Sequence, residues 1–229
     1  MNCLKLWKTQ KFDFIQAGHA IVGALVPDYD QVQKISIIPR SNGAGGLTFF
    51  APQESRLESG MYSKQYLESQ LAVALGGRLA EEIIYGESQV TTGASNDIQQ
   101  VANIAMRMVK EWGMSDKVGR IVLNDASRGG PMRMMMRRQT TWGNKILGDV
   151  EAEVERLVNN SYLIAKQILE DNRDLLDHLA AVLIEQEVVS AEEFQMMLVQ
   201  YNAQTIDYKT IGEERNREKL PFQYMPPSI

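Results

Sequence analysis

Apolar residues recur at helical spacing along most of this chain, and that periodicity limits the fold to a mainly α-helical one. The spacing predicts helices over residues 12–25, 62–85, 95–112, 147–169, 174–184 and 190–199. Pro27 ends the first of them, because proline has no backbone N–H to donate. Short alternating segments at residues 32–39 and 47–50 flank a glycine cluster, which is typical of a small β-ribbon. The sequence therefore predicts a mainly α-helical fold with one small β-ribbon.

The length of 229 residues and the apolar content of 44% suffice for a hydrophobic core without disulfides or a structural metal. We expect a lead-in at residues 1–11, one folded domain at 12–203, and an extended or disordered tail at 204–229. Residues 125–143 interrupt the helical pattern with glycines, a proline and a run of methionine and arginine. This segment is either a mobile loop whose methionines pack opportunistically or a basic contact surface for a partner.

Composition and missing motifs exclude several functions. The net charge of −5, without a lysine-rich run, argues against a nucleic-acid binder. The longest apolar stretch, residues 20–26, is far shorter than the roughly 20 residues that cross a bilayer. The chain has no G-x-x-x-x-G-K-[ST], G-x-S-x-G or C-x-x-C motif, so we expect no nucleotide site, no serine-hydrolase elbow and no redox cysteine pair in it.

Five short motifs follow one another in order along the chain. They are I-Q-A-G-H at 15–19, I-S-I-I-P-R at 35–40, L-G-G-R-L-A-E-E at 75–82, T-T-G-A-S-N-D at 91–97 and E-W-G-M-S at 111–115. Over residues 12–199 the chain resembles the protease domain of the FtsH family, the membrane-anchored AAA+ zinc metalloproteases of bacteria, mitochondria and plastids. The resemblance implies an FtsH-type peptidase domain, mostly helical with a small β-ribbon, that normally follows an ATPase module and assembles as a sixfold ring.

The first motif departs from the family at the metal site. The family's helix carries H-E-A-G-H, in which histidines one turn apart bind zinc and the glutamate between them acts as general base. Ile15 stands at the first histidine position and has no donor atom, and the amide of Gln16 cannot accept a proton at neutral pH. The resemblance leaves His19 and Asp97 as two of the three ligands that a catalytic zinc needs. We therefore expect a degenerate site, with zinc unfavoured and no cofactor in this chain.

The other candidate site residues have both structural and functional interpretations. His19 is also typical of a hydrogen-bonded core histidine, and Asp97 suits the positive end of its helix. Glu81 and Glu82 could orient a metal ligand, or one of them could be a solvated or ion-paired surface residue. His178 and Cys3 are the remaining imidazole and thiol that could in principle replace a missing ligand.

The β-ribbon offers a second kind of site. In the active relatives an exposed strand edge beside the zinc receives the substrate as an added strand, which needs no catalytic residue. The candidate edge residues here are Ile35, Ile37, Leu47 and Phe49. The ribbon either still binds extended polypeptide or is covered by neighbouring subunits.

The resemblance and the substitutions together favour a proteolytically inactive FtsH-like domain. We expect it to assemble with FtsH-like AAA+ subunits, as a homo- or hetero-oligomer such as a hexamer, in protein quality control, unfolding or import. The resemblance favours a plastid, on the stromal side of the envelope or thylakoid membrane, over another membrane-associated site on a cytosolic or matrix side. Membrane contact is expected only through partners or through an N-terminal anchor outside this sequence. The sequence itself is either a piece of a longer chain or a stand-alone subunit.

Two alternatives remain open at this point. One is an active ATP-dependent zinc endopeptidase with a non-standard ligand set, which would hold nearly one zinc per chain and lose activity to a chelator. The other is a soluble adaptor that recruits client polypeptides through residues 129–138 and the C-terminal tail.

Overall fold

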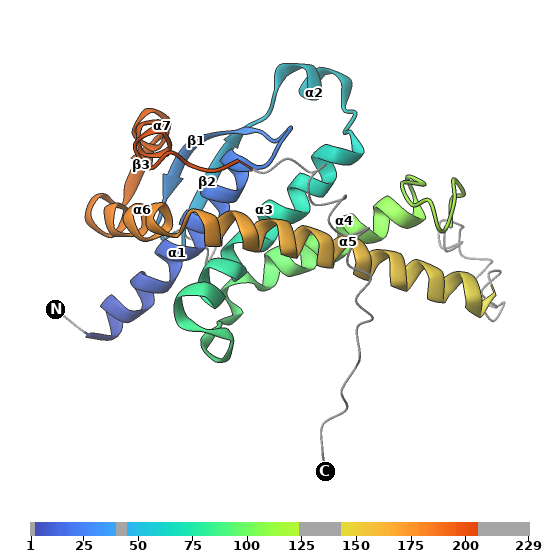
Figure 1. Cartoon of the computed structure of the whole chain (residues 1–229), viewed down its shortest axis with the longest axis horizontal. Coiled ribbons are helices and arrows are strands. Elements are labelled where there is room, and N and C mark those ends of the chain that lie inside the picture. Colours follow the sequence, from blue (N-terminus) through green and yellow to red (C-terminus); the bar gives the residue numbers. More distant parts are fainter. Residues whose placement is uncertain (1–2, 40–44, 124–142, 206–229) are drawn as a thin grey trace, which may run out of the picture.

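The computed structural model describes residues 3–39, 45–123 and 143–205 and confirms the mainly helical fold. Its elements follow one another as α1 (Cys3–Leu25), β1 (Gln31–Ser36), β2 (Leu47–Ala51), α2 (Glu54–Ser59), α3 (Lys64–Tyr85), the short 3₁₀ turns η1 (Glu87–Gln89) and η2 (Thr92–Ala94), α4 (Ser95–Lys110), α5 (Asn144–Asp171), α6 (Arg173–Gln186), β3 (Val188–Ser190) and α7 (Ala191–Gln200). In Figure 1, α1 and α3 lie at the centre and the long α5 runs across the molecule.

The two central helices cross with their backbones in contact. A Cβ added at Gly18 would lie 2.5 Å from the carbonyl oxygen of Gly76, and one added at Gly76 would lie 2.9 Å from the carbonyl oxygen of Gly18. Any side chain at either position would separate α1 from α3. This contact explains why a helix as long as α3 tolerates glycine in its middle, where glycine costs about 1 kcal/mol of helix stability.

The core is built on both sides of this crossing. α5 packs against α3 and α4, while α6 packs against α1. The largest fully buried side chains on these helices are Ile21, Leu71, Leu79, Met108, Leu157, Ile168, Leu169, Leu175, Leu176 and Leu179. They come from every predicted helix except the last one, whose Phe194 is also fully buried. The helices predicted from apolar periodicity therefore all contribute buried side chains to the core.

The sheet has three strands rather than the two of the predicted ribbon. Its order is β2-β1-β3, with both pairs antiparallel and Ile35 opposite Val189 in the added pair. β3 has only three residues between α6 and α7, which is too short to show a strand period in the sequence. The sheet therefore joins the N-terminal ribbon to the C-terminal helices.

The element boundaries differ from the prediction at a few places. α1 begins at Cys3 rather than at the predicted Phe12, so the residues expected to form a lead-in are its first turns. The capping box that opens α7 is confirmed, because Ser190 Oγ accepts from the Glu193 N–H while the Glu193 carboxylate accepts from the Ser190 N–H. Residues 124–142 and 206–229 lie outside the described residues, so the predictions for the arginine–methionine segment and the tail remain predictions.

Within the described part of the chain, every helix is too short or too polar to cross a bilayer.

Candidate functional site

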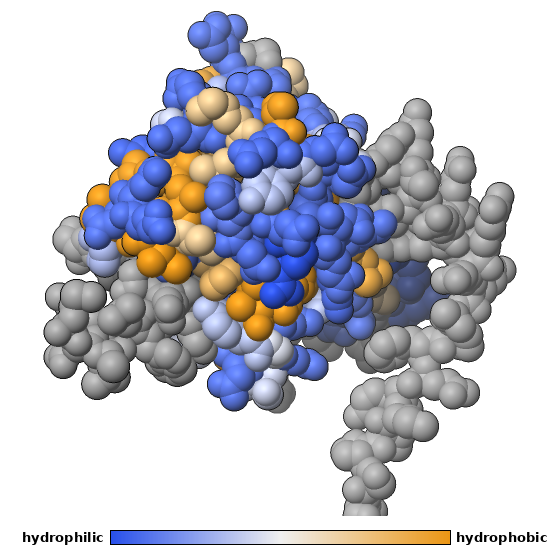
Figure 2. Space-filling model, turned by 60° about the vertical axis from the view of Figure 1, so that its left-hand side comes forward, coloured by the Kyte–Doolittle hydropathy of each residue, from blue (hydrophilic) through white to orange (hydrophobic). Residues whose placement is uncertain are grey.

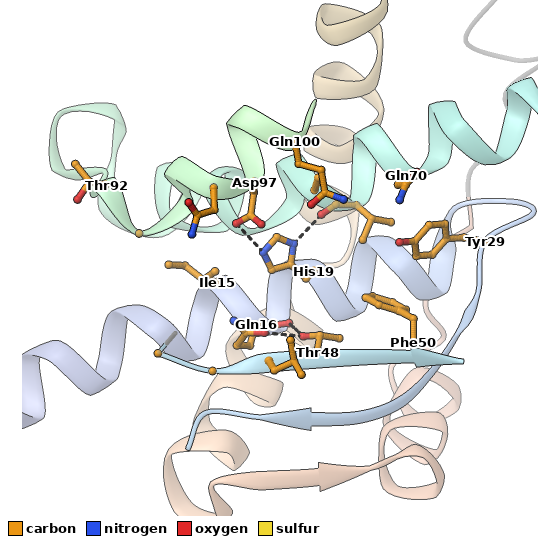
Figure 3. Close-up of a pocket in the computed structure, with 17 residues that line it drawn as sticks. Ile15, Gln16, His19, Tyr29, Thr48, Phe50, Gln70, Thr92, Asp97 and Gln100 are labelled. Carbon is orange, nitrogen blue, oxygen red and sulfur yellow. Dashed lines mark hydrogen bonds and ion pairs between the residues drawn. The ribbon is translucent and has the colours of Figure 1, made fainter. Parts of the chain in front are cut away.

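A cavity of about 580 Å³ opens between α1, β2, α3 and the first turns of α4. Figure 3 shows α1 side chains entering it from one side, with β2 along its floor and α4 opposite. Its volume lies within the range of small-molecule and peptide side-chain pockets. Five of the predicted site residues line this one cavity: Ile15, Gln16, His19, Leu47 and Asp97.

The imidazole of His19 is held between two helices. Its Nδ1 lies 2.7 Å from the carbonyl oxygen of Val73, and since a carbonyl can only accept, Nδ1 carries a proton. The other ring nitrogen, Nε2, faces the Asp97 carboxylate at 3.5 Å (Figure 3). A Cβ at Gly77 would lie 2.5 Å from Nε2, so only glycine there leaves room for the ring. The structure thus brings together two residues that are far apart in the sequence.

Ile15 lies beside the His19 ring, one helical turn earlier on α1. Its Cγ2 would be 2.8 Å from a Cβ at Gly77, the same point that the His19 ring approaches. The side chain is buried, with 4% of its surface exposed. A hydrocarbon group therefore occupies the place next to His19 Nε2 where the family motif H-E-A-G-H has its other histidine.

Gln16 connects α1 to the sheet. Its Oε1 accepts a hydrogen bond of 2.9 Å from the hydroxyl of Thr48 on β2, and that hydroxyl also lies 3.2 Å from the Gln16 carbonyl oxygen. The residue is nearly buried, with 8% of its surface exposed. The side chain at the general-base position is thus an amide that holds helix and sheet together at the cavity floor.

A catalytic zinc does not fit these residues. His19 Nε2 and Asp97 Oδ2 are two donors, whereas such an ion takes three protein ligands and keeps one position for water. Among the side chains that the structure describes, no three from histidine, cysteine, aspartate or glutamate are grouped to hold a metal ion. The His178 ring instead lies against Tyr201, with ring centroids 5.2 Å apart, and Cys3 is about 18 Å from Ile15 along α1. We therefore derive no hydrolytic step at this site.

The two glutamates at the end of α3 serve separate contacts. Glu81 is fully buried and accepts from the Thr91 hydroxyl at 2.6 Å and from the Thr91 N–H at 3.3 Å. Glu82 accepts from the Tyr162 hydroxyl of α5 at 2.7 Å, and burial together with this carboxylate raises the pKa of Tyr162 to about 12. Glu81 thus fixes the segment that leads into α4 and Asp97, while Glu82 fixes α5 to α3.

Removal of the Thr91 hydroxyl should destabilise the protein. Thr91→Val keeps the shape of the side chain but leaves the buried Glu81 carboxylate without its shortest hydrogen bond. We expect the free energy of unfolding to fall by about 1–3 kcal/mol, measured by urea titration. The matched control is Thr92→Val, an exposed neighbour, for which the change should stay within about 0.5 kcal/mol. Equal effects of the two variants would contradict the role assigned to the Glu81 contact.

In the sheet β2 is an outer strand and β1 is the central one, so the expected free edge at β1 is wrong, while peptide binding at β2 remains a prediction. Ile35 lies on the central strand, paired with Thr48 of β2 and Val189 of β3. Ile37 follows the end of β1, and its N–H donates to the Glu187 carbonyl; both isoleucine side chains are buried. Leu47 and Phe49 lie on the outer strand, where Leu47 lines the cavity and Phe49 is half exposed. The sequence could not reveal this, because the strand that covers β1 comes from the other end of the chain.

Several cavity residues were not singled out from the sequence. Tyr29 and Phe50 form an aromatic wall, with ring centroids 5.1 Å apart at 76°. Gln70 and Gln100 line the remaining wall (Figure 3), and Asn96 also lines the cavity, so three carboxamides face it. Gln100 follows Asp97 by three residues and so shares its helix face, and this spacing could have predicted that Gln100 lines the same site. Tyr29 and Gln70 had no comparable signal.

The helical scaffold, with the I-Q-A-G-H helix and the aspartate of a second helix beside a sheet edge, is that of a peptidase-type domain. The chain belongs to peptidase family M41, which it matches over residues 8–197. It is 53% identical over 188 residues to the ATP-dependent zinc metalloprotease FtsH 3 of Synechocystis, an alignment that covers 82% of this chain and 30% of that protein. It is 50% identical to the chloroplastic FTSH 5 of Arabidopsis thaliana, with coverage of 82% and 27%, and 49% identical to a chloroplastic FTSH of Nicotiana tabacum, with coverage of 82% and 26%. The chain thus spans less than a third of the length of these relatives.

Proposed function

We propose that this domain is a proteolytically inactive member of its family that acts as a structural or regulatory subunit. The observation that carries this proposal is the pair of side chains at the start of the site. Ile15 places hydrocarbon next to His19 Nε2, and the Gln16 amide oxygen accepts from Thr48. Neither residue can perform the metal-binding or proton-accepting work that the H-E-x-x-H motif performs.

We further propose that the domain works within an AAA+ ring, as a homo- or hetero-oligomer such as a hexamer. Support comes from the relatives, whose names describe ATP-dependent proteases and, in the plant proteins, a chloroplastic location. Quality control, unfolding or import of client polypeptides at a plastid membrane is the role that follows. Cleavage in such a ring would belong to subunits that keep the full motif.

The cavity gives this role a physical basis that does not require chemistry. β2 presents an outer strand edge beside it, and the carboxamides of Gln70, Asn96 and Gln100 offer both donors and acceptors. An extended polypeptide can pair with such an edge through its main chain. We propose that a client polypeptide is held here without being cut.

Zinc content is the decisive test of the inactive assignment. The full chain, purified without a metal-binding tag, should contain far less than one zinc per chain by mass spectrometry, and it should not cleave unfolded casein. The full-length Synechocystis relative, assayed with ATP, provides a positive control in both assays. About one zinc per chain, together with cleavage that a chelator abolishes, would overturn the proposal.

A further inference from the structure

The surface formed by α6, β3 and α7 is acidic. From residue 174 to residue 204 the sequence has no lysine or arginine, and its acidic residues there are Asp174, Asp177, Glu185, Glu187, Glu192 and Glu193. Asp177 pairs with Arg173, and Glu193 caps α7. The carboxylates of Glu185, Glu187 and Glu192 are exposed. Coulomb repulsion among them is relieved most directly by a cationic partner.

Large apolar side chains are exposed among these carboxylates. Met196 and Val199 are 63% and 80% exposed, and with Glu192 they follow the i, i+4, i+7 spacing of a single stripe along α7. Ile184 at the end of α6 is 42% exposed. Figure 2, which turns this side of the molecule toward the viewer, shows orange apolar side chains set among blue polar ones. We call Ile184, Glu185, Glu187, Glu192, Met196 and Val199 the acidic face.

A segment of opposite chemistry occurs elsewhere in the same sequence. Residues 128–138 contain arginines at 128, 133, 137 and 138, methionines at 132 and 134–136, and no acidic residue. Arginine forms bidentate hydrogen bonds with carboxylates, and methionine adapts its shape to irregular apolar surfaces. Both components of this segment therefore match the acidic face.

The segment cannot reach the acidic face of its own chain. It lies between the described residues Leu123 and Gly143, so even its midpoint is within roughly 35 Å of Gly143 when fully extended. α5 starts directly after Gly143 and its 28 residues span about 42 Å. α6 begins where α5 ends, and Figure 1 shows α6 and α7 beyond that far end. A segment 128–138 bound at the acidic face would therefore belong to another molecule.

We propose that the acidic face binds residues 128–138 of a second copy of this chain. The two surfaces are different, so the contact is head-to-tail and generates a closed ring or an open chain of copies. This inference rests on the assembly part of the proposed function and is independent of whether the domain holds zinc.

A charge-swap experiment on the full chain tests the pairing. One variant carries Glu185→Arg and Glu192→Arg on the acidic face, and the other carries Arg133→Glu, Arg137→Glu and Arg138→Glu. By sedimentation velocity at low salt, each variant alone should self-associate about tenfold or more weakly than the natural protein. An equimolar mixture should regain association to within about threefold, because the reversed face of one then meets the reversed segment of the other. Thermal melts followed by circular dichroism establish that both variants fold.

Matched controls locate the effect. Glu151→Arg with Glu155→Arg makes the same change of charge at exposed positions of α5 and should leave association unchanged. Met196→Ser with Val199→Ser should weaken association, whereas Leu57→Ser, at a 66% exposed residue of α2, should not.

Three results would overturn the proposal. The first is a natural protein that stays monomeric at about 100 µM, well above the dissociation constant of a specific interface. The second is normal self-association of the charge-reversed variants. The third is an equimolar mixture that does not regain association. Recovery with Lys5→Glu, Lys8→Glu and Lys11→Glu in place of the arginine reversals would assign the face to the N-terminal helix instead. Zinc measured in the same samples reports on the inactive assignment separately.

Discussion

The double substitution Ile15→His, Gln16→Glu should raise the zinc content of this protein to about one ion per chain. Residues 15 and 19 lie one turn apart on α1, and both side chains approach the same point over Gly77. A histidine at position 15 would therefore direct a ring nitrogen toward His19 Nε2 and Asp97 Oδ2, which are already 3.5 Å apart. Three ligands then converge where two are present now. The gain in zinc affinity should exceed the roughly 10–100-fold effect of outer partners on a metal site.

Single substitutions separate ligand number from general changes in the cavity. Gln16→Glu alone should bind little zinc, because it leaves the second imidazole absent. Ile15→Ala opens the same space without adding a donor and should also bind little. His19→Ala added to the double variant should abolish the gain. Zinc content is read by mass spectrometry after gel filtration, and a double variant that stays empty would show that the scaffold no longer holds the ligand geometry.

The helices of this fold could be predicted from the sequence because each carries a long apolar stripe. α4, α5, α6 and α7 each bury one face, whereas α1 and α3 are buried on most sides, and apolar residues at helical spacing indicate both kinds of helix. β3 was not predicted from the sequence, because its pairing with β1 joins positions separated by more than 150 residues, such as Ile35 and Val189. Local sequence carries no signal for such a partner, and the central place of β1 was missed with it.

The candidate site was predictable only where motifs carried it. The proximity of His19 and Asp97 came from the family resemblance, since nothing in the local sequence relates two helices so far apart. The Val73 carbonyl that orients the imidazole is a backbone group, and any residue at that position would supply it. Thr48 was within the predicted ribbon, but its bond to Gln16 depends on how α1 lies across β2. Positions of side chains thus followed from packing rather than from residue type.

Asp13 is a further residue that the sequence did not single out. It lies on α1, two residues before Ile15, and is fully buried. Neither of its carboxylate oxygens has a hydrogen-bond partner among the residues that the structure describes. Burial raises the pKa of Asp13 from 3.8 to about 7. Burial, together with the charges of Asp13 and Glu81, also raises the pKa of Tyr85, whose ring packs edge-on against Phe14. α1 therefore holds a carboxyl group that stays protonated to a higher pH in the folded protein than in the unfolded chain.

Asp13→Asn should make the free energy of unfolding less dependent on pH between about pH 4 and pH 7. The pKa of Asp13 is higher in the folded than in the unfolded chain, so the natural protein is favoured by protonation below about pH 4 and loses that stability as pH rises through about 7. The loss is at most about 4 kcal/mol for a shift of this size. Asparagine cannot ionise, so the variant should keep a nearly constant contribution from this position. Its own unpartnered amide costs about 1–3 kcal/mol at every pH, which lowers the curve without changing its slope.

Urea unfolding of both proteins at pH 5, 6, 7 and 8 measures the difference. Glu155→Gln, at an exposed position of α5, should follow the natural protein at each pH. Parallel curves for the natural protein and Asp13→Asn would show that the Asp13 carboxyl ionises without cost and is therefore not buried in solution.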